Sequence, residues 1–109
     1  MLRGGPAGGG YSTAADLLAF ATAMRENRLV RQETRDLLWS PKPELKSPEY
    51  GYGFGIEDGG RTVGHTGGFT GISSSLSIRL DEGLTVVSLS NVSGGSQRAG
   101  TKVDELVGR

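Results

Sequence analysis

Apolar residues recur along the first third of this chain with the period of an α-helix. Ser12 and Thr13 precede the first apolar run, and Asp16 lies three residues after Thr13. This order resembles a capping box, with a carboxylate placed where the helix dipole favours it. The pattern predicts a helix that begins after Thr13 and continues to about Arg25. Its apolar face consists of Ala14, Leu17, Leu18, Ala21 and Met24.

A second, shorter helix is predicted from Arg31 to Trp39. Two prolines, Pro41 and Pro43, end it, because proline cannot continue a helix. The polar segment 42–49 is therefore expected to be a loop. The side chains expected to point inward from this helix are Val30, Leu37 and Leu38.

After this loop the hydrophobic period changes from that of a helix to that of a strand. Aromatic and aliphatic residues alternate with glycine over 50–56, which predicts a strand with one aromatic face and one bare face. A bare glycine face indicates that another segment packs very close to it. We interpret the aromatic row as core instead of a ligand-stacking platform. The row consists of Tyr50, Tyr52 and Phe54, followed by Ile56.

The remaining pattern predicts more strands and a last helix. Asp58 to Gly60 forms a turn into a short strand, Arg61 to His65. The following strand alternates Leu76, Ile78 and Leu80 with polar residues, and a hairpin turn at 81–83 follows it. Leu84 to Val92 is apolar on both faces and is expected to be a central strand. A short helix is expected near Gly100 to Val107. These elements predict one α+β domain over 1–109, with an antiparallel sheet of about three strands, two helices before it and one after it.

Composition excludes several classes of function. The 12 basic and 12 acidic side chains balance and form no basic stripe, so nucleic acid is not an expected partner. The chain has no cysteine, which excludes disulfides and thiolate catalysis. No stretch reaches the roughly 20 apolar residues that span a bilayer. The start, Met1 to Gly5, has no apolar signal-peptide core, so we expect any export signal to lie elsewhere. The cellular compartment stays open, and no cofactor is expected.

The 19 glycines cluster between the predicted elements, and one cluster, 64–71, contains the only histidine, His65. An imidazole can gain or lose a proton near neutral pH, and the neighbouring glycines let another molecule approach the backbone. General acid–base chemistry or substrate orientation is one interpretation. The other is a histidine at a strand end with a satisfied hydrogen bond. Metal ligation is disfavoured, because only Glu57 and Asp58 lie close in sequence.

The pair Gly67 and Gly68 is open to two interpretations as well. Their backbone N–H groups could stabilise a developing oxyanion. A tight turn or a β-bulge, which is the commoner cause of paired glycines, would explain both without any function.

Four segments together resemble the serine β-lactamase-like superfamily. This group contains class C β-lactamases, D,D-carboxypeptidases, D-aminopeptidases and related esterases. Each segment alone is weakly specific, whereas four in this order over about 8–92 are more specific. The segments are Gly9–Leu17 (GGYSTAADL), Tyr50–Gly55 (YGYGFG), Gly64–Gly68 (GHTGG) and Leu89–Asn91 (LSN).

The resemblance implies roles for the histidine segment, which is similar to the third catalytic box of that family. By this match, His65 and Gly68 are catalytic: His65 helps to position substrate and supports proton transfer, and the N–H of Gly68 forms half of the oxyanion hole. Thr66 and Gly67 bind substrate, the first through its hydroxyl and the second by leaving room beside the nucleophile. The substrate would be a small molecule, a peptide or an ester.

The chain departs from the family pattern at the nucleophile. No serine is followed by lysine three positions later, and no Tyr-x-Asn or Ser-x-Asn box is present. We therefore expect this chain to be the C-terminal portion of such a hydrolase and to be inactive alone. Leu84 to Val92 is then expected to be an open edge strand that pairs with a second copy or with an N-terminal piece. A non-catalytic module that binds ligands through the same groove, and a purely structural domain, are the alternatives.

Overall fold

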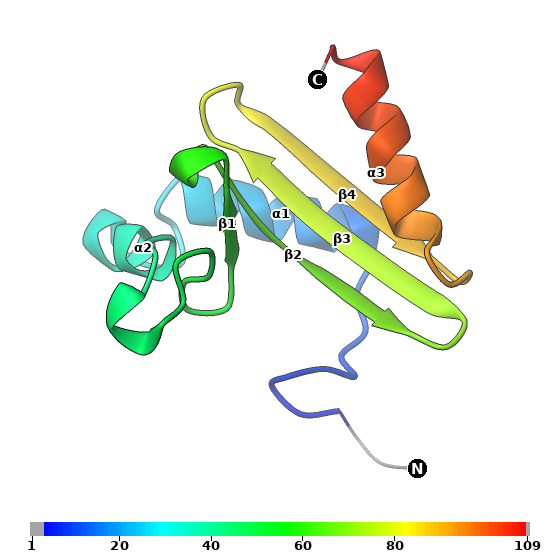
Figure 1. Ribbon diagram of the computed structural model, residues 1–109, viewed down its shortest axis with the longest axis horizontal. Coiled ribbons are helices and arrows are strands. Elements are labelled where there is room, and N and C mark those ends of the chain that lie inside the picture. The colour runs from blue at the N-terminus through cyan, green and yellow to red at the C-terminus, as the bar shows by residue number, and fades with distance from the viewer. Residues whose placement is uncertain (1–3, 109) are drawn as a thin grey trace.

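The computed structural model describes residues 4–108. Met1–Arg3 and Arg109 lie outside the described residues. The prediction that Met1 to Gly5 has no signal-peptide core falls partly on these residues. The described chain forms three α-helices and one antiparallel sheet with the strand order β1-β2-β3-β4 (Figure 1). This is the α+β class that the sequence predicts, with four strands where about three were expected. The helices are α1 (Ala14–Arg25), α2 (Gln32–Leu38) and α3 (Gly95–Leu106), and the strands are β1 (Gly55–Glu57), β2 (Thr62–Phe69), β3 (Ile72–Arg79) and β4 (Leu84–Ser90).

The first helix begins where its cap predicts. The side chain of Thr13 accepts a hydrogen bond from the backbone N–H of Asp16, at 3.1 Å. Of the predicted apolar face, only Ala21 and Met24 are buried, while Leu18 is 47% exposed. The hydrophobic core gathers around Val63 and Ile78, so only the C-terminal half of α1 reaches it.

The cap offers a direct test of the start of α1. Thr13→Ala is expected to lower the free energy of unfolding by about 1 kcal/mol, because the N–H of Asp16 loses its acceptor. Denaturant titration measures this difference. Ser12→Ala is the matched control, since the Ser12 hydroxyl donates only to the carbonyl of Thr13. Equal losses in both variants would contradict the cap.

The predicted inward side of the second helix is wrong in one position. Leu37 is 57% exposed, whereas Trp39, directly after α2, is buried. The Trp39 ring packs edge to face with Phe54, with centroids 5.8 Å apart, and the guanidinium of Arg35 lies over the indole, 5.3 Å from its centroid. The large indole therefore takes the core position, and Leu37 is turned to solvent.

The predicted strand over 50–56 is wrong for most of its length. The N–H of Gly51 donates to the carbonyl of Phe54 at 2.8 Å, and Gly53 has φ = 81°, so 51–54 is a tight turn. A Cβ on Gly51 would collide with the carbonyl oxygen of Leu38. Close packing against the glycines is thus confirmed at this residue. The alternation reflects the turn, not a pleat.

The aromatic row is core only in part. Phe54 and Ile56 are buried, but Tyr50 and Tyr52 are 39% and 48% exposed. The turn at 51–54 reverses the chain, so the two tyrosines do not share a face with Phe54. The interpretation of all three aromatic residues as core is therefore wrong for the tyrosines.

Within residues 4–108, β4 pairs only with β3 and lies at the edge of the sheet, so its predicted central position is wrong. The strand β4 is apolar on both faces because a helix packs against each face of the sheet. Ile78 shares the core with α1, while its neighbour Arg79 pairs with Asp104 of α3. Adjacent strand residues point to opposite faces, so α1 and α3 cover opposite faces of the sheet, and both contact β4.

Two other elements are longer than predicted. The strand β2 continues through the glycines to Phe69, and α3 begins at Gly95 instead of Gly100. The earlier start of α3 is fixed by a buried hydrogen bond, in which the N–H of Ser96 donates to the hydroxyl of Ser73 at 2.9 Å. The longest helices of the described chain have 12 residues, and none is long and apolar enough to cross a membrane.

Candidate active-site wall

The histidine segment lies where β2 loses one of its two neighbours. The strand β1 pairs with β2 only over Thr62 to Gly64, whereas β3 pairs with the whole length of β2. From His65 to Phe69 the outer edge of β2 has no partner strand in the described part of the chain. Exposure follows the same boundary, since Thr62 and Val63 are buried and 65–69 are exposed. The glycine segment is therefore an open sheet edge.

The hydrogen-bond pattern shows which backbone groups face this open edge. The N–H of Leu80 donates to the carbonyl of Arg61 at 2.8 Å, so the backbone groups of Arg61 point toward β3. Direction alternates from residue to residue in an antiparallel strand. Residues 63, 65 and 67 therefore also point toward β3, and the N–H groups of Thr66 and Gly68 point outward at the open edge.

Side chains alternate between the two faces of the sheet at the same place. His65 lies opposite Leu76 and Gly67 opposite Ser74, on the face toward α1, whereas Thr66 lies opposite Ser75 on the face toward α3. Pleating thus puts the imidazole and the Thr66 hydroxyl on different sides of the strand. Both still border one hollow, because no strand covers the edge between them.

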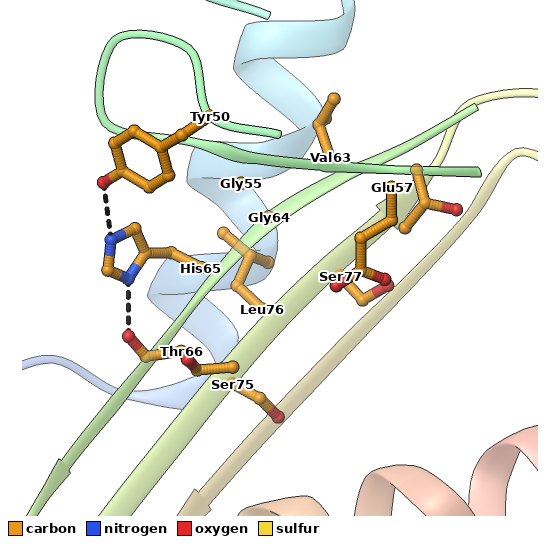
Figure 2. Close-up of a pocket in the computed structure, with 11 residues that line it drawn as sticks. Tyr50, Gly55, Glu57, Val63, Gly64, His65, Thr66, Ser75, Leu76 and Ser77 are labelled. Carbon is orange, nitrogen blue, oxygen red and sulfur yellow. Dashed lines mark hydrogen bonds between the residues drawn. The ribbon is translucent and has the colours of Figure 1, made fainter. Parts of the chain in front are cut away.

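The imidazole of His65 is held at both ring nitrogens. Nδ1 lies 2.5 Å from the carbonyl oxygen of Thr66, and Nε2 lies 2.8 Å from the hydroxyl of Tyr50 (Figure 2). A carbonyl oxygen only accepts, so Nδ1 carries a proton and donates it. In the neutral ring Nε2 is then the acceptor, and the Tyr50 hydroxyl donates to it. The ring therefore has a defined tautomer.

Two open hollows meet at Tyr50 and His65. The first, of about 280 Å³, lies along β1 and β2, and Glu57 is the only acidic residue that lines it. The second, of about 520 Å³, lies between these two side chains and the N-terminal segment, which contributes Gly5 to Gly8 and Gly10. Both Tyr50 and His65 line each of the two hollows. Polar groups at the rim of the first hollow include Thr62, Thr66, Ser75 and Ser77.

The two glycines of the segment differ in their surroundings. A Cβ on Gly67 would lie 2.6 Å from the hydroxyl oxygen of Ser74, whereas a Cβ on Gly68 would meet nothing within 4 Å. Neither glycine forms a turn, since both belong to β2 and neither has a positive φ. The tight turn that would have explained both residues without function is therefore absent at this place.

The structure brings together most of what the sequence singles out and adds one residue. His65, Thr66, Gly67 and Gly68 are consecutive on one exposed edge. Tyr50 was missed as a site residue, because its alternation with glycine was interpreted as core. No group of three or more metal-binding side chains occurs among residues 4–108.

Backbone N–H groups and histidines are among the groups that oxyanion-binding sites use. The family model described as Beta-lactamase matches residues 1–108, so this chain belongs to the β-lactamase family. No curated protein and no solved structure shows significant similarity to it.

Proposed function

We propose that residues 1–109 form a single domain that supplies one wall of the active site of a serine hydrolase of the β-lactamase family. His65 orients substrate and supports proton transfer, and the N–H of Gly68 donates one hydrogen bond to the oxyanion. Thr66 binds substrate through its hydroxyl, and the missing side chain of Gly67 leaves room at the edge. The observation that carries the proposal is the outward direction of the Gly68 N–H beside His65.

The electrostatics of the edge suit this role. A backbone N–H fixed in a sheet points at the place where negative charge develops and needs no reorganisation during the reaction. A single such donor is worth about 3 kcal/mol of transition-state stabilisation in other acyl-transfer sites. A histidine side chain can accept a proton as imidazole and donate one as imidazolium.

The nucleophile and its base come from residues other than these 109. No Ser-x-x-Lys motif occurs in the chain, and a nucleophile and its base act as a unit. The chain by itself therefore binds substrate without turning it over. Within residues 4–108, β4 pairs only with β3, so its other edge is free. This edge receives either a strand of the part that carries the nucleophile or a second copy of this chain.

An NMR titration with a peptide that ends in D-Ala-D-Ala, and separately with p-nitrophenyl acetate, tests this function. We expect chemical-shift changes confined to Gly64–Gly71 and Tyr50 with at least one probe. His65→Ala should weaken binding roughly tenfold, which corresponds to about 1.4 kcal/mol.

Arg28→Ala is the matched control, because it removes an exposed ion pair with Glu26, and both residues are distant in sequence from Tyr50 and from the histidine segment. It should leave binding unchanged. Lack of response to both probes at millimolar concentration would contradict the binding role and favour a purely structural domain. Hydrolysis of nitrocefin by the purified 109-residue chain would contradict the external nucleophile.

A further inference from the structure

The side chain of Tyr50 reaches His65 from a different part of the fold. We propose that Tyr50 is the positioning residue that, together with the carbonyl of Thr66, fixes the tautomer and the ring orientation of His65. This inference rests on the proposed function, in which His65 faces the substrate. Tyr50 acts through the imidazole and has no assigned contact with the reacting atoms.

The turn at 51–54 places this tyrosine. Tyr50 forms an isolated bridge with Gly55, and the N–H of Ile56 donates to the carbonyl of Glu49 at 2.9 Å. Gly55 in turn lies opposite Gly64 on β2. Tyr50, which precedes the turn, is thus carried to a position beside His65, the residue after Gly64. The close-up shows the phenol and the imidazole pointing toward one another (Figure 2).

Two contacts define the geometry of the pair. The Tyr50 hydroxyl and Nε2 of His65 are 2.8 Å apart, and the two rings meet edge to face, with centroids 5.7 Å apart and planes at 75°. Among residues 4–108, Tyr50 is the only residue whose side chain makes a hydrogen bond to His65. Rotation of the imidazole about its χ2 angle would break both this bond and the bond from Nδ1 to Thr66.

The hydrogen bond to Nε2 has a chemical consequence. Because the Thr66 carbonyl takes the proton of Nδ1, the Tyr50 hydroxyl has to donate to the lone pair of Nε2. The two partners therefore select the same Nδ1–H tautomer. Both ring nitrogens are engaged, so substrate could reach the lone pair of Nε2 only in place of the Tyr50 hydroxyl.

A structural role alone does not account for the pair. Tyr50 is 39% exposed and His65 is exposed, so their contact buries little apolar surface. A hydrogen bond this close to solvent adds little to the stability of the fold. Both residues border both hollows, which places the bond where a ligand would meet it.

Tyr50→Phe separates positioning from packing, since it removes one oxygen and keeps the ring. In mildly alkaline solution, where imidazole is neutral, ¹⁵N chemical shifts of the ring nitrogens report the tautomer. We expect the wild-type chain to show protonated Nδ1 and unprotonated Nε2. In Tyr50→Phe the two shifts should move toward each other, as the tautomers mix, and the D-Ala-D-Ala peptide should bind about three- to tenfold more weakly.

Tyr52→Phe is the matched control. It removes a hydroxyl that makes no hydrogen bond within residues 4–108 and keeps the ring over which the Lys42 ammonium lies at 4.6 Å. It should leave the ¹⁵N shifts of His65 as they are in the wild type, and the melting temperatures of all three proteins should agree.

Two outcomes separate this inference from the proposed function. Identical ring ¹⁵N shifts in Tyr50→Phe and the wild type would overturn the positioning role, whether or not the peptide binds. Mixed tautomers in Tyr50→Phe, with no peptide binding by the wild type, would support the positioning role and count against the proposed function.

Discussion

Gly64→Ala is expected to lower the free energy of unfolding by about 3 kcal/mol or more, in the range of the severe single substitutions. A Cβ at this position would collide with the carbonyl oxygen of Leu76 and lie 3.2 Å from the Cα of Ser77. Both atoms are backbone, so no side-chain rotation relieves the contact. The strands β2 and β3 would have to separate beside Val63 and Ile78, which are fully buried.

Urea unfolding followed by fluorescence measures this loss, because Trp39 is the only tryptophan and is buried against Phe54. Gly68→Ala is the matched control on the same strand. Its Cβ would meet nothing within 4 Å, so the stability should stay within about 0.5 kcal/mol of the wild type. Equal stability of the two variants would refute the close approach at Gly64.

Asp104→Ala is expected to lower the free energy of unfolding by about 2 kcal/mol, between the values for exposed and for buried pairs, because the guanidinium that it leaves is buried while Asp104 itself is 46% exposed. The side chain of Arg79 is only 2% exposed and pairs with Asp104 of α3. Without Asp104, the guanidinium keeps only Glu82, 3.6 Å away. The substitution should also release α3 from the sheet, and amide exchange along 95–106 should quicken more than exchange in β2.

Two further variants make this expectation specific. Lys102→Ala breaks an exposed pair with Glu105 on the same helix and should cost less than about 0.5 kcal/mol. The double variant Arg79→Met, Asp104→Ala should recover part of the loss, since it leaves no uncompensated charge in the interior. If the double variant is less stable than Asp104→Ala alone, the loss has another cause than the buried guanidinium.

Local sequence signals predicted the parts of the fold that depend on neighbours in the chain. The hydroxyl of Thr13 predicted the start of α1, and the glycine at the end of 81–83 predicted the β3–β4 hairpin. The same signals failed where distant segments decide the outcome. Tyr50 and Leu37 were assigned to the core from spacing alone, and both are substantially exposed.

The site shows the same division. That His65, Thr66, Gly67 and Gly68 belong together followed from their order and from the resemblance to the β-lactamase family, which the family match over 1–108 bears out at the level of the family. Their roles stay predictions. No pattern in the sequence indicated that Tyr50 contacts His65, because 15 residues and a chain reversal separate the two.

The sequence by itself determined the α+β class and the family and singled out the candidate segment around His65, since all three depend on residue order and short-range periodicity. Only the tertiary structure decided that β1 stops beside Gly64, that β2 continues as an open edge, and that a tyrosine holds the histidine. The physical reason is that strand neighbours and side-chain partners are chosen by packing between distant segments. Periodicity shows which face of an element is apolar but not which edge is left uncovered.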